Sequence, residues 1–140
     1  MKTVPDHFFQ QSAVLPFRQD RGRLEILLIT SRRKKRWVIP KGVCELDMDS
    51  GASAAKEALE EAGIEGDVST RPIGRYQYDK WGGTCSVEVF SMAVHTSYDV
   101  WPESYRDRDW LTPDEAIARV DEPDLKAIIE QFVATRVEVP

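Results

Sequence analysis

Short hydrophobic runs dominate the first part of the chain and predict strands. The run at residues 24–30, LEILLIT, is rich in leucine and β-branched residues, which suits a buried strand. A strand is also predicted over residues 12–18, with a polar turn at residues 20–22 between the two. A third apolar segment begins at Trp37 and is stopped by Pro40, which cannot donate to a strand ladder.

The pattern then changes to a helical period over residues 51–62. Small apolar side chains recur there at helical spacing, Ser50 is the predicted N-cap, and Gly63 is a natural terminator. Two long strands follow, over residues 67–78 and 84–96, and the adjacent glycines between them suit a hairpin.

The last part of the chain predicts a long polar loop over residues 97–109 and then two helices. The first helix has an N-cap, a first-turn proline and a capping-box acid at Thr112, Pro113 and Glu115. The second begins near Asp121 and carries an apolar stripe, formed by Leu125, Ile128, Ile129, Phe132 and Val133. These elements predict an α/β (α+β) sandwich with a central mixed β-sheet, as one domain spanning 1–140.

Composition and charge narrow the function classes. The formal net charge of −5 argues against a nucleic acid polymer as partner, and no apolar run is long enough to cross a membrane. The chain starts without the apolar segment of a secretion signal, so we expect a cytoplasmic protein. Cys44 and Cys85 lack metal-ligand spacing and are expected to be free thiols. Residues 32–36, RRKKR, form a local basic run that can attract an anionic small molecule.

An acidic face is the most specific chemical feature of the central helix. Glu57, Glu60 and Glu61 lie three and four positions apart, so they share one face of the helix. Glu57 and Glu61 repel each other by roughly 0.2–0.5 kcal/mol at this spacing unless a counter-charge is present. A divalent cation would supply it, since hard ions such as Mg²⁺ take few carboxylates and keep positions for water and phosphate.

The spacing around these acids resembles the signature of the Nudix hydrolases. In that family a glycine is followed at fixed intervals by a glutamate, an Arg-Glu pair, a Glu-Glu pair and a closing glycine. The matching positions here are Gly42, Glu57, Glu60, Glu61 and Gly63. The resemblance implies a Nudix-type α/β/α sandwich that hydrolyses a phosphoanhydride bond. It implies Glu57 and Glu61 as the primary Mg²⁺ ligands, with Mn²⁺ as the alternative ion, the Gly42 carbonyl as a further ligand, and Glu60 as ligand or general base.

Three positions depart from this signature. Met48 replaces the first glutamate, Lys56 replaces the arginine, and Ala58 replaces a larger aliphatic residue. In the family the missing glutamate and arginine brace the loop and the helix. We therefore expect a replacement pairing, with Asp47 or Asp49 taking part.

The resemblance extends to the branch that contains the diphosphoinositol polyphosphate phosphohydrolases. It rests on residues in the first strand, after the second strand, at the entry to the signature and in residues 101–110, WPESYRDRDW. Basic residues at such places in that branch hold a polyanionic substrate. This implies phosphate binding by Arg18, Arg32, Lys41 and Arg108.

The general base and the substrate keep several candidates. Many family members take an acid from a later loop, which here offers Glu103 and Asp107. The predicted substrate is a highly anionic small molecule, such as a diphosphoinositol polyphosphate or a dinucleoside polyphosphate. One alternative is a nucleotide or sugar-nucleotide pyrophosphohydrolase, in which Tyr76, Tyr78 and Trp81 stack on a base. Another is a Nudix-fold sensor that binds without cleaving. The sequence predicts no oligomeric state.

Overall fold

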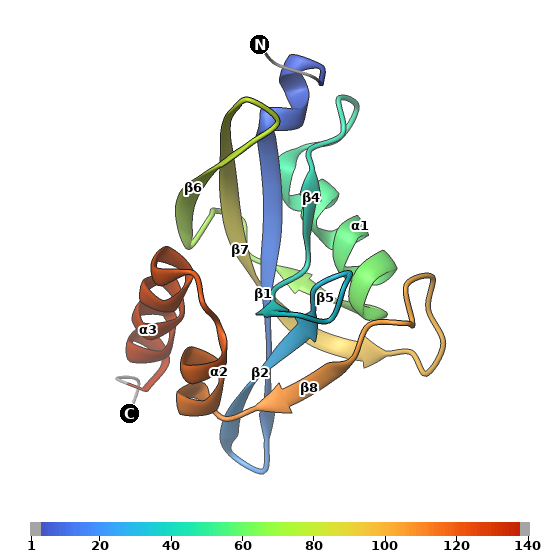
Figure 1. Ribbon diagram of the computed structural model, residues 1–140. Helices are drawn as coiled ribbons and strands as arrows, with labels where there is room; N and C mark the ends of the chain where they lie inside the picture. The colour runs from blue at the N-terminus through green and yellow to red at the C-terminus, as the bar shows by residue number, and fades with distance from the viewer. Residues whose placement is uncertain (1–3, 138–140) are drawn as a thin grey trace.

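A computed structural model describes residues 4–137, in which one mixed sheet is covered by helices (Figure 1). The strands are β1 (Gln10–Asp20), β2 (Arg23–Thr30), β3 (Trp37–Val38), β4 (Lys41–Val43), β5 (Ile64–Val68), β6 (Gly74–Lys80), β7 (Gly83–Ser97) and β8 (Arg108–Leu111). The helices are the 3₁₀ turn η1 (Asp6–Phe9), α1 (Ser50–Ala62), α2 (Pro113–Arg119) and α3 (Pro123–Val137). The strand order is β3-β2-β1-β7-β5, with β4 beside β1, β6 beside β7 and β8 beside β2. β1 and β7 run parallel, which makes the sheet mixed.

The two faces of the sheet carry separate hydrophobic layers. Along β1 the side chains alternate, so Ala13 and Leu15 pack in the layer that contains the apolar residues of α3, while Val14 packs in the layer that contains α1. The predicted stripe on α3 is buried as far as Phe132, and Val133 is partly buried. The predicted α/β/α sandwich is therefore confirmed.

Small side chains bring α1 close to the sheet. Ala54, Ala58 and Ala62 are each 0% exposed and lie in the layer between the helix and the strands. A larger aliphatic residue at Ala58 would need space that this close approach removes. The departure from the family signature at this position thus fits the packing, and it leaves the acidic face of α1 close to β4.

Two sequence predictions near α1 were wrong by small margins. Asp49, not Ser50, is the N-cap, because the Asp49 carboxylate accepts the Ala52 N–H at 2.7 Å and Ser50 already lies in the helix. The strand expected from Trp37 to Ile39 ends at Val38, and a separate strand, β4, follows Pro40. The predicted terminator is confirmed, since Gly63 has a left-handed φ of 65°.

The structure differs from two further predictions, which concern the strand over residues 67–78 and the loop over residues 97–109. The strand expected over residues 67–78 is broken into β5 and β6, which lie along one edge of β7 and are separated by a turn in which the Ser69 hydroxyl donates to the Arg71 carbonyl at 2.8 Å. The end of the predicted long loop forms β8, because Trp110 pairs with Leu27 of β2. The capping box of Thr112 and Glu115 is confirmed.

Two further observations concern the described residues. Cys44 and Cys85 are both free thiols, as predicted. Within residues 4–137, no helix is long and apolar enough to cross a membrane.

Candidate active site

The acidic face of α1 lies against β4, so that the two ends of the signature meet. The Lys41 backbone N–H donates to Glu61 Oε1 at 3.2 Å. Gly42 faces Glu57 so closely that a Cβ at this position would lie 2.4 Å from the Glu57 carboxylate carbon. Only glycine leaves room for this carboxylate, which explains the first residue of the signature in physical terms.

Burial makes the two acids hold protons tightly, and the negative charges of neighbouring carboxylates add to this effect. Burial raises the pKa of Glu61 to about 8, against the opposing effects of Arg106 and the Lys41 N–H. Burial also raises the pKa of Glu57 to about 7, and the negative charges of Glu60 and Glu103 add to this rise. A cation bound between these carboxylates would remove both causes and displace the protons.

Glu60 points to a different neighbour, and this neighbour replaces the missing brace of the signature. The Lys56 ammonium lies 2.5 Å from Glu45 Oε1 and 3.9 Å from Glu60 Oε1. The hydrogen bond to Glu45 raises the pKa of Lys56. The acid that ties the loop to α1 is therefore Glu45, and the expected participation of Asp47 or Asp49 was wrong. Asp49 is engaged as the N-cap of α1 instead.

Reversing the charges of this brace gives a direct test. We expect Lys56→Glu to weaken binding of Mg²⁺ about tenfold, because it breaks the tie to Glu45 and so loosens the loop that precedes α1. Adding Glu45→Lys to the same protein is expected to restore most of the affinity. Isothermal titration with Mg²⁺ measures both effects. A double variant no better than Lys56→Glu alone would contradict the brace.

The loop from Tyr98 to Asp107 fastens onto the C-terminal end of α1. The carbonyls of Glu60 and Glu61 accept bonds from the Glu103 N–H at 3.0 Å and the Trp101 indole N–H at 2.9 Å. The next two carbonyls, of Ala62 and Gly63, accept from the Arg108 guanidinium at 2.7 Å and from the Tyr98 N–H at 2.8 Å. The last carbonyls of a helix have no partners inside it, and residues 98–108 supply hydrogen bonds to them here.

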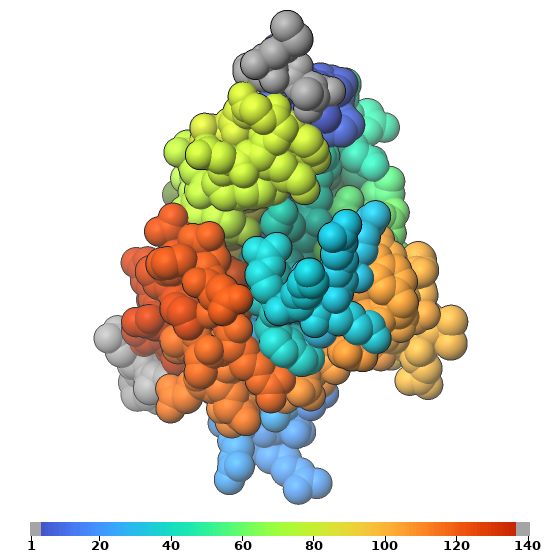
Figure 2. Space-filling model, viewed as in Figure 1, coloured from blue at the N-terminus to red at the C-terminus, as the bar shows by residue number. Residues whose placement is uncertain are grey.

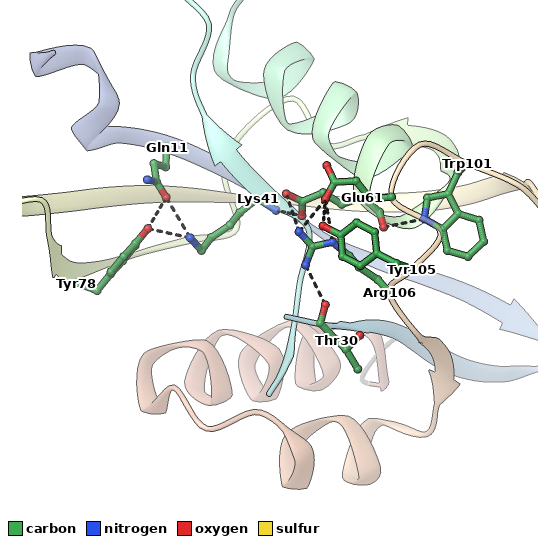
Figure 3. Close-up of polar contacts among 9 residues, drawn as sticks. Gln11, Thr30, Lys41, Glu61, Tyr78, Trp101, Tyr105 and Arg106 are labelled. Carbon is green, nitrogen blue, oxygen red and sulfur yellow. Dashed lines mark hydrogen bonds and ion pairs between the residues drawn. The ribbon is translucent and has the colours of Figure 1, made fainter. Parts of the chain in front are cut away.

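This attachment places Glu103 beside the acidic pair and Arg106 among the acids. Arg106 is 8% exposed, donates to Glu103 Oε1 at 2.9 Å, and lies 3.9 Å from Glu61 Oε2. Its guanidinium also donates to the Thr30 carbonyl at 2.9 Å. Figure 3 shows Arg106 between Glu61 and Thr30. Arg106 is not distinguished by sequence alone, because burial of one arginine among several in residues 101–110 has no local sequence signal.

Asp107, the other candidate base in this loop, is turned to a different partner. Its carboxylate is exposed and lies 3.6 Å from the Lys34 ammonium, while its N–H donates to the Thr30 hydroxyl at 2.9 Å. The negative charge of Glu103, by contrast, contributes to the raised pKa of both Glu57 and Glu61. The structure therefore favours Glu103.

Of the four predicted phosphate-binding residues, Lys41 lies next to the acids. Its ammonium donates to Gln11 Oε1 at 3.2 Å and to the Tyr78 hydroxyl at 2.8 Å. Figure 3 shows its side chain extending toward Gln11 and Tyr78, while Glu61 lies on the other side. Burial and the nearby Lys80 lower the pKa of Lys41, and Glu61 opposes this change.

The remaining three lie in different surroundings. Arg32 is exposed on the basic loop. Arg18 pairs with Glu25 at 2.8 Å and covers the Trp110 ring at 4.2 Å. Arg108 caps α1 and stacks on Trp101, with its guanidinium carbon 3.9 Å from the ring centroid. The phosphate-binding roles of these arginines stay predictions, and the donors of Arg18 and Arg108 already have partners.

The donor set fits a hydrated divalent ion. Among the described residues there is no ready-made group of three His, Cys, Asp or Glu side chains arranged to hold a metal. Two partly buried carboxylates, Glu57 and Glu61, nevertheless face one strand, and the signature glycine keeps space for Glu57. An ion that uses one or two carboxylates and retains water and phosphate ligands matches this arrangement better than a closed protein cage.

The fold and site together define an α/β/α sandwich whose central helix presents a partly buried pair of acids beside a close glycine. Residues 9–132 match the profile described as the NUDIX domain, and the chain belongs to this family. Family members generally use divalent metal ions.

Curated relatives and solved structures agree with this assignment. Nudix hydrolase 21, chloroplastic, of Arabidopsis thaliana is 32% identical over 80% of this chain and 58% of its own length. Diphosphoinositol polyphosphate phosphohydrolase 3-beta of Bos taurus is 29% identical over 81% of this chain and 70% of its own. The C. elegans Ap4A hydrolase has the same fold, with a TM-score of 0.75 at 21% identity over 91% of this chain and 97% of that one.

The matched region is shorter than the plant relatives themselves. The chain spans 53–63% of the length of four Nudix hydrolases of Arabidopsis thaliana, those numbered 21, 12, 13 and 18. Their names assign them to chloroplasts or mitochondria, so the cytoplasmic location expected for this chain stays a prediction.

Proposed function

We propose that this chain is a Mg²⁺-dependent hydrolase of phosphoanhydride bonds, with Mn²⁺ as the alternative ion. The observation that carries the proposal is the partly buried pair of Glu57 and Glu61, with pKa values raised to about 7 and about 8, in which Glu57 faces a glycine that has no room for a side chain. Two acids kept in an unfavourable environment are typical of a functional site.

The residues of the chain divide the work of hydrolysis. Glu57 and Glu61 hold the ion, with the Gly42 carbonyl and Glu60 as further candidate ligands. A bound Mg²⁺ neutralises charge on a diphosphate and lowers the pKa of a coordinated water. Lys41 binds a phosphate group of the substrate, and the basic loop that carries Arg32 adds positive potential at the surface.

We assign the general base to Glu103. Arg106 holds its carboxylate at 2.9 Å, and the Tyr105 hydroxyl donates to the same oxygen at 3.1 Å. Within residues 4–137 these bonds all go to Oε1, so Oε2 of Glu103 can accept a proton from the attacking water. Both partners fix the orientation of the carboxylate, which a base needs in order to reach its water in line with the phosphorus.

A screen for released products, separated by anion-exchange chromatography, tests this function, because dinucleoside polyphosphates and sugar nucleotides are cleaved without release of inorganic phosphate. The substrates are diphosphoinositol polyphosphates, dinucleoside polyphosphates, nucleoside triphosphates and sugar nucleotides, each with Mg²⁺, with Mn²⁺ and with EDTA. We expect metal-supported release from a highly anionic small molecule and none in EDTA. A ligand that binds with Mg²⁺ and is recovered uncleaved, with no release from any substrate, would instead support the sensor hypothesis.

A further inference from the structure

The loop from Tyr98 to Asp107 joins β7 to β8 and lies at the C-terminal end of α1 (Figure 1). Figure 2 shows this orange segment at one side of the molecule, next to the blue segment that follows β2. The loop contains no helix or strand, although it carries Glu103, the assigned general base. Contacts of individual side chains and backbone groups, rather than an element of secondary structure, therefore fix the position of this acid.

Trp101 packs against the glycine that closes the signature. A Cβ on Gly63 would lie 2.8 Å from each of three side-chain atoms of Trp101. The Trp101 indole N–H donates to the Glu61 carbonyl at 2.9 Å, and Figure 3 shows the ring at the end of α1. Gly63 therefore has two functions, because it ends α1 with a left-handed backbone and leaves room for the Trp101 ring.

Arg108 stacks on the same ring and connects the loop with α1. Its guanidinium carbon lies 3.9 Å from the centroid of the Trp101 ring. Nη1 donates to the Ala62 carbonyl at 2.7 Å, and Nη2 donates to the Tyr98 carbonyl at 2.5 Å. The planar guanidinium thus joins the last turn of α1 to the first residue of the loop. A lysine cannot replace it, since an ammonium neither donates from two fixed positions nor stacks as a flat group.

These contacts oppose the phosphate-binding role that the family resemblance implies for Arg108. Both of its terminal nitrogens donate to backbone carbonyls, and one of these carbonyls belongs to the end of a helix. A phosphate that drew the side chain away would leave these carbonyls without their partners. The contacts of Arg108 instead favour a role in holding the loop.

The position of Trp101 is transmitted to Glu103 over two residues. Pro102, between them, has a fixed φ, and the Ser104 N–H donates to the Trp101 carbonyl at 3.1 Å, which closes a tight turn. The Glu103 N–H donates to the Glu60 carbonyl at 3.0 Å. A shift of Trp101 would therefore carry Glu103 with it, and a displacement of about 1 Å in a catalytic group can cost about 10²-fold in rate.

We propose that Trp101 and Arg108 form a clamp that positions the Glu103 carboxylate for the attack of water on phosphorus. In this role Arg108 acts through the clamp and does not bind a phosphate group of the substrate. The inference rests on the proposed function, in which Glu103 is the general base. Trp101 and Arg108 are positioning residues, because they act on the reacting water only through this acid.

Arg108→Lys separates the two roles of Arg108, because it keeps the positive charge and removes the two-sided hydrogen bonding. We expect kcat to fall about tenfold while KM and Mg²⁺ affinity stay within about twofold of the wild type. The measurement is steady-state hydrolysis of the best substrate of the screen, with the products separated by anion exchange. A KM raised about tenfold at unchanged kcat would show that Arg108 binds phosphate, and unchanged values of both would show no role. Either result would overturn the inference.

The same substitution in a Glu103→Gln protein tests whether Arg108 acts through the base. We expect Arg108→Lys to lower kcat by less than about twofold in this background, because no base is left to position. A tenfold loss in both backgrounds would mean that Arg108 acts independently of Glu103, which contradicts the clamp.

Trp101→Phe provides a second test of the clamp. It keeps a ring beside Gly63 and removes only the indole N–H, so kcat is expected to fall about threefold, again only when Glu103 is present. Val100→Ala is the matched control, since the Val100 side chain is 82% exposed in the same loop, and it is expected to change neither kcat nor KM. Thermal unfolding identifies a variant that fails to fold, and the other substitution then decides the test.

Hydrogen exchange distinguishes failure of the clamp from failure of the hydrolase. Exchange of the Glu103 N–H, followed by NMR without substrate, reports how firmly the loop is held on α1. We expect Arg108→Lys to accelerate this exchange about tenfold or more and Val100→Ala to leave it unchanged. Accelerated exchange, with no hydrolysis of any substrate by the wild type, would keep the clamp and reject the hydrolase. Hydrolysis by the wild type, with unchanged exchange in Arg108→Lys, would keep the hydrolase and reject the clamp.

Discussion

Glu103→Gln is expected to lower the turnover number of metal-dependent hydrolysis by about 10²-fold or more, the usual size of a general-base effect. The amide keeps the shape of the side chain and still accepts a bond from Arg106, but it cannot take a proton from water. Binding of Mg²⁺ is expected to change little, because Glu57 and Glu61 are intact. The measurement is turnover at saturating substrate and metal, with metal affinity determined separately by titration.

Asp107→Asn is the matched control for this prediction. Both residues belong to the same loop, but the Asp107 carboxylate is exposed and paired with Lys34 at 3.6 Å. Its substitution is expected to leave turnover within about twofold of the wild type, because its exposed carboxylate pairs with Lys34 at the surface. If Asp107→Asn lost more turnover than Glu103→Gln, the assignment of the base would be wrong.

The elements of this fold follow from local patterns that the sequence displays. LEILLIT, the stripe on α3, the capping box at Thr112 and Glu115, and the close of α1 at Gly63 are each set by burial, period or capping within a few residues. The strands β4 and β8 were not predicted, because each forms by pairing with a distant strand. Gly42 of β4 pairs with Ser12 of β1, and Trp110 of β8 pairs with Leu27 of β2. Short strands of this kind have little pattern of their own.

The candidate site also contains residues that local patterns predict and residues that only long-range contacts place. The acids of α1 were predicted because helical spacing and the family signature both operate within one segment. The roles of Arg106 and Arg108 were not predictable, since arginines in one short stretch become a buried partner of acids and a helix cap only through long-range contacts with Thr30 and Ala62. The pairing of Lys56 was predictable only in part. A replacement for the missing brace was expected, but its partner, Glu45, is set by the conformation of the loop.

Gly42→Ala is expected to reduce hydrolysis by about 10²-fold or more while changing the free energy of unfolding by less than about 1 kcal/mol. The new Cβ would lie 2.4, 2.5 and 2.7 Å from three atoms at the end of the Glu57 side chain. Because these atoms end a flexible chain, Glu57 can rotate away at small cost. Gly42 is not among the described residues with positive φ, so alanine fits the backbone. The cost falls on the position of the carboxylate, and Mg²⁺ affinity is expected to fall with activity.

Two other glycines separate displacement of Glu57 from general damage. A Cβ on Gly66 would lie 2.2 Å from the Ala93 carbonyl oxygen, which is backbone and cannot move aside, so Gly66→Ala is expected to lose stability. A Cβ on Gly51 meets its neighbours at 3.6–3.7 Å, which is ordinary contact. Gly51→Ala is therefore expected to reduce neither the stability of the protein nor its Mg²⁺ affinity. Urea unfolding, Mg²⁺ titration and substrate hydrolysis are measured on all three variants, so that the stability, metal affinity and activity of each can be compared. A Gly42→Ala protein that kept its Mg²⁺ affinity, or that lost activity only in proportion to stability, would show that Glu57 does not hold the ion.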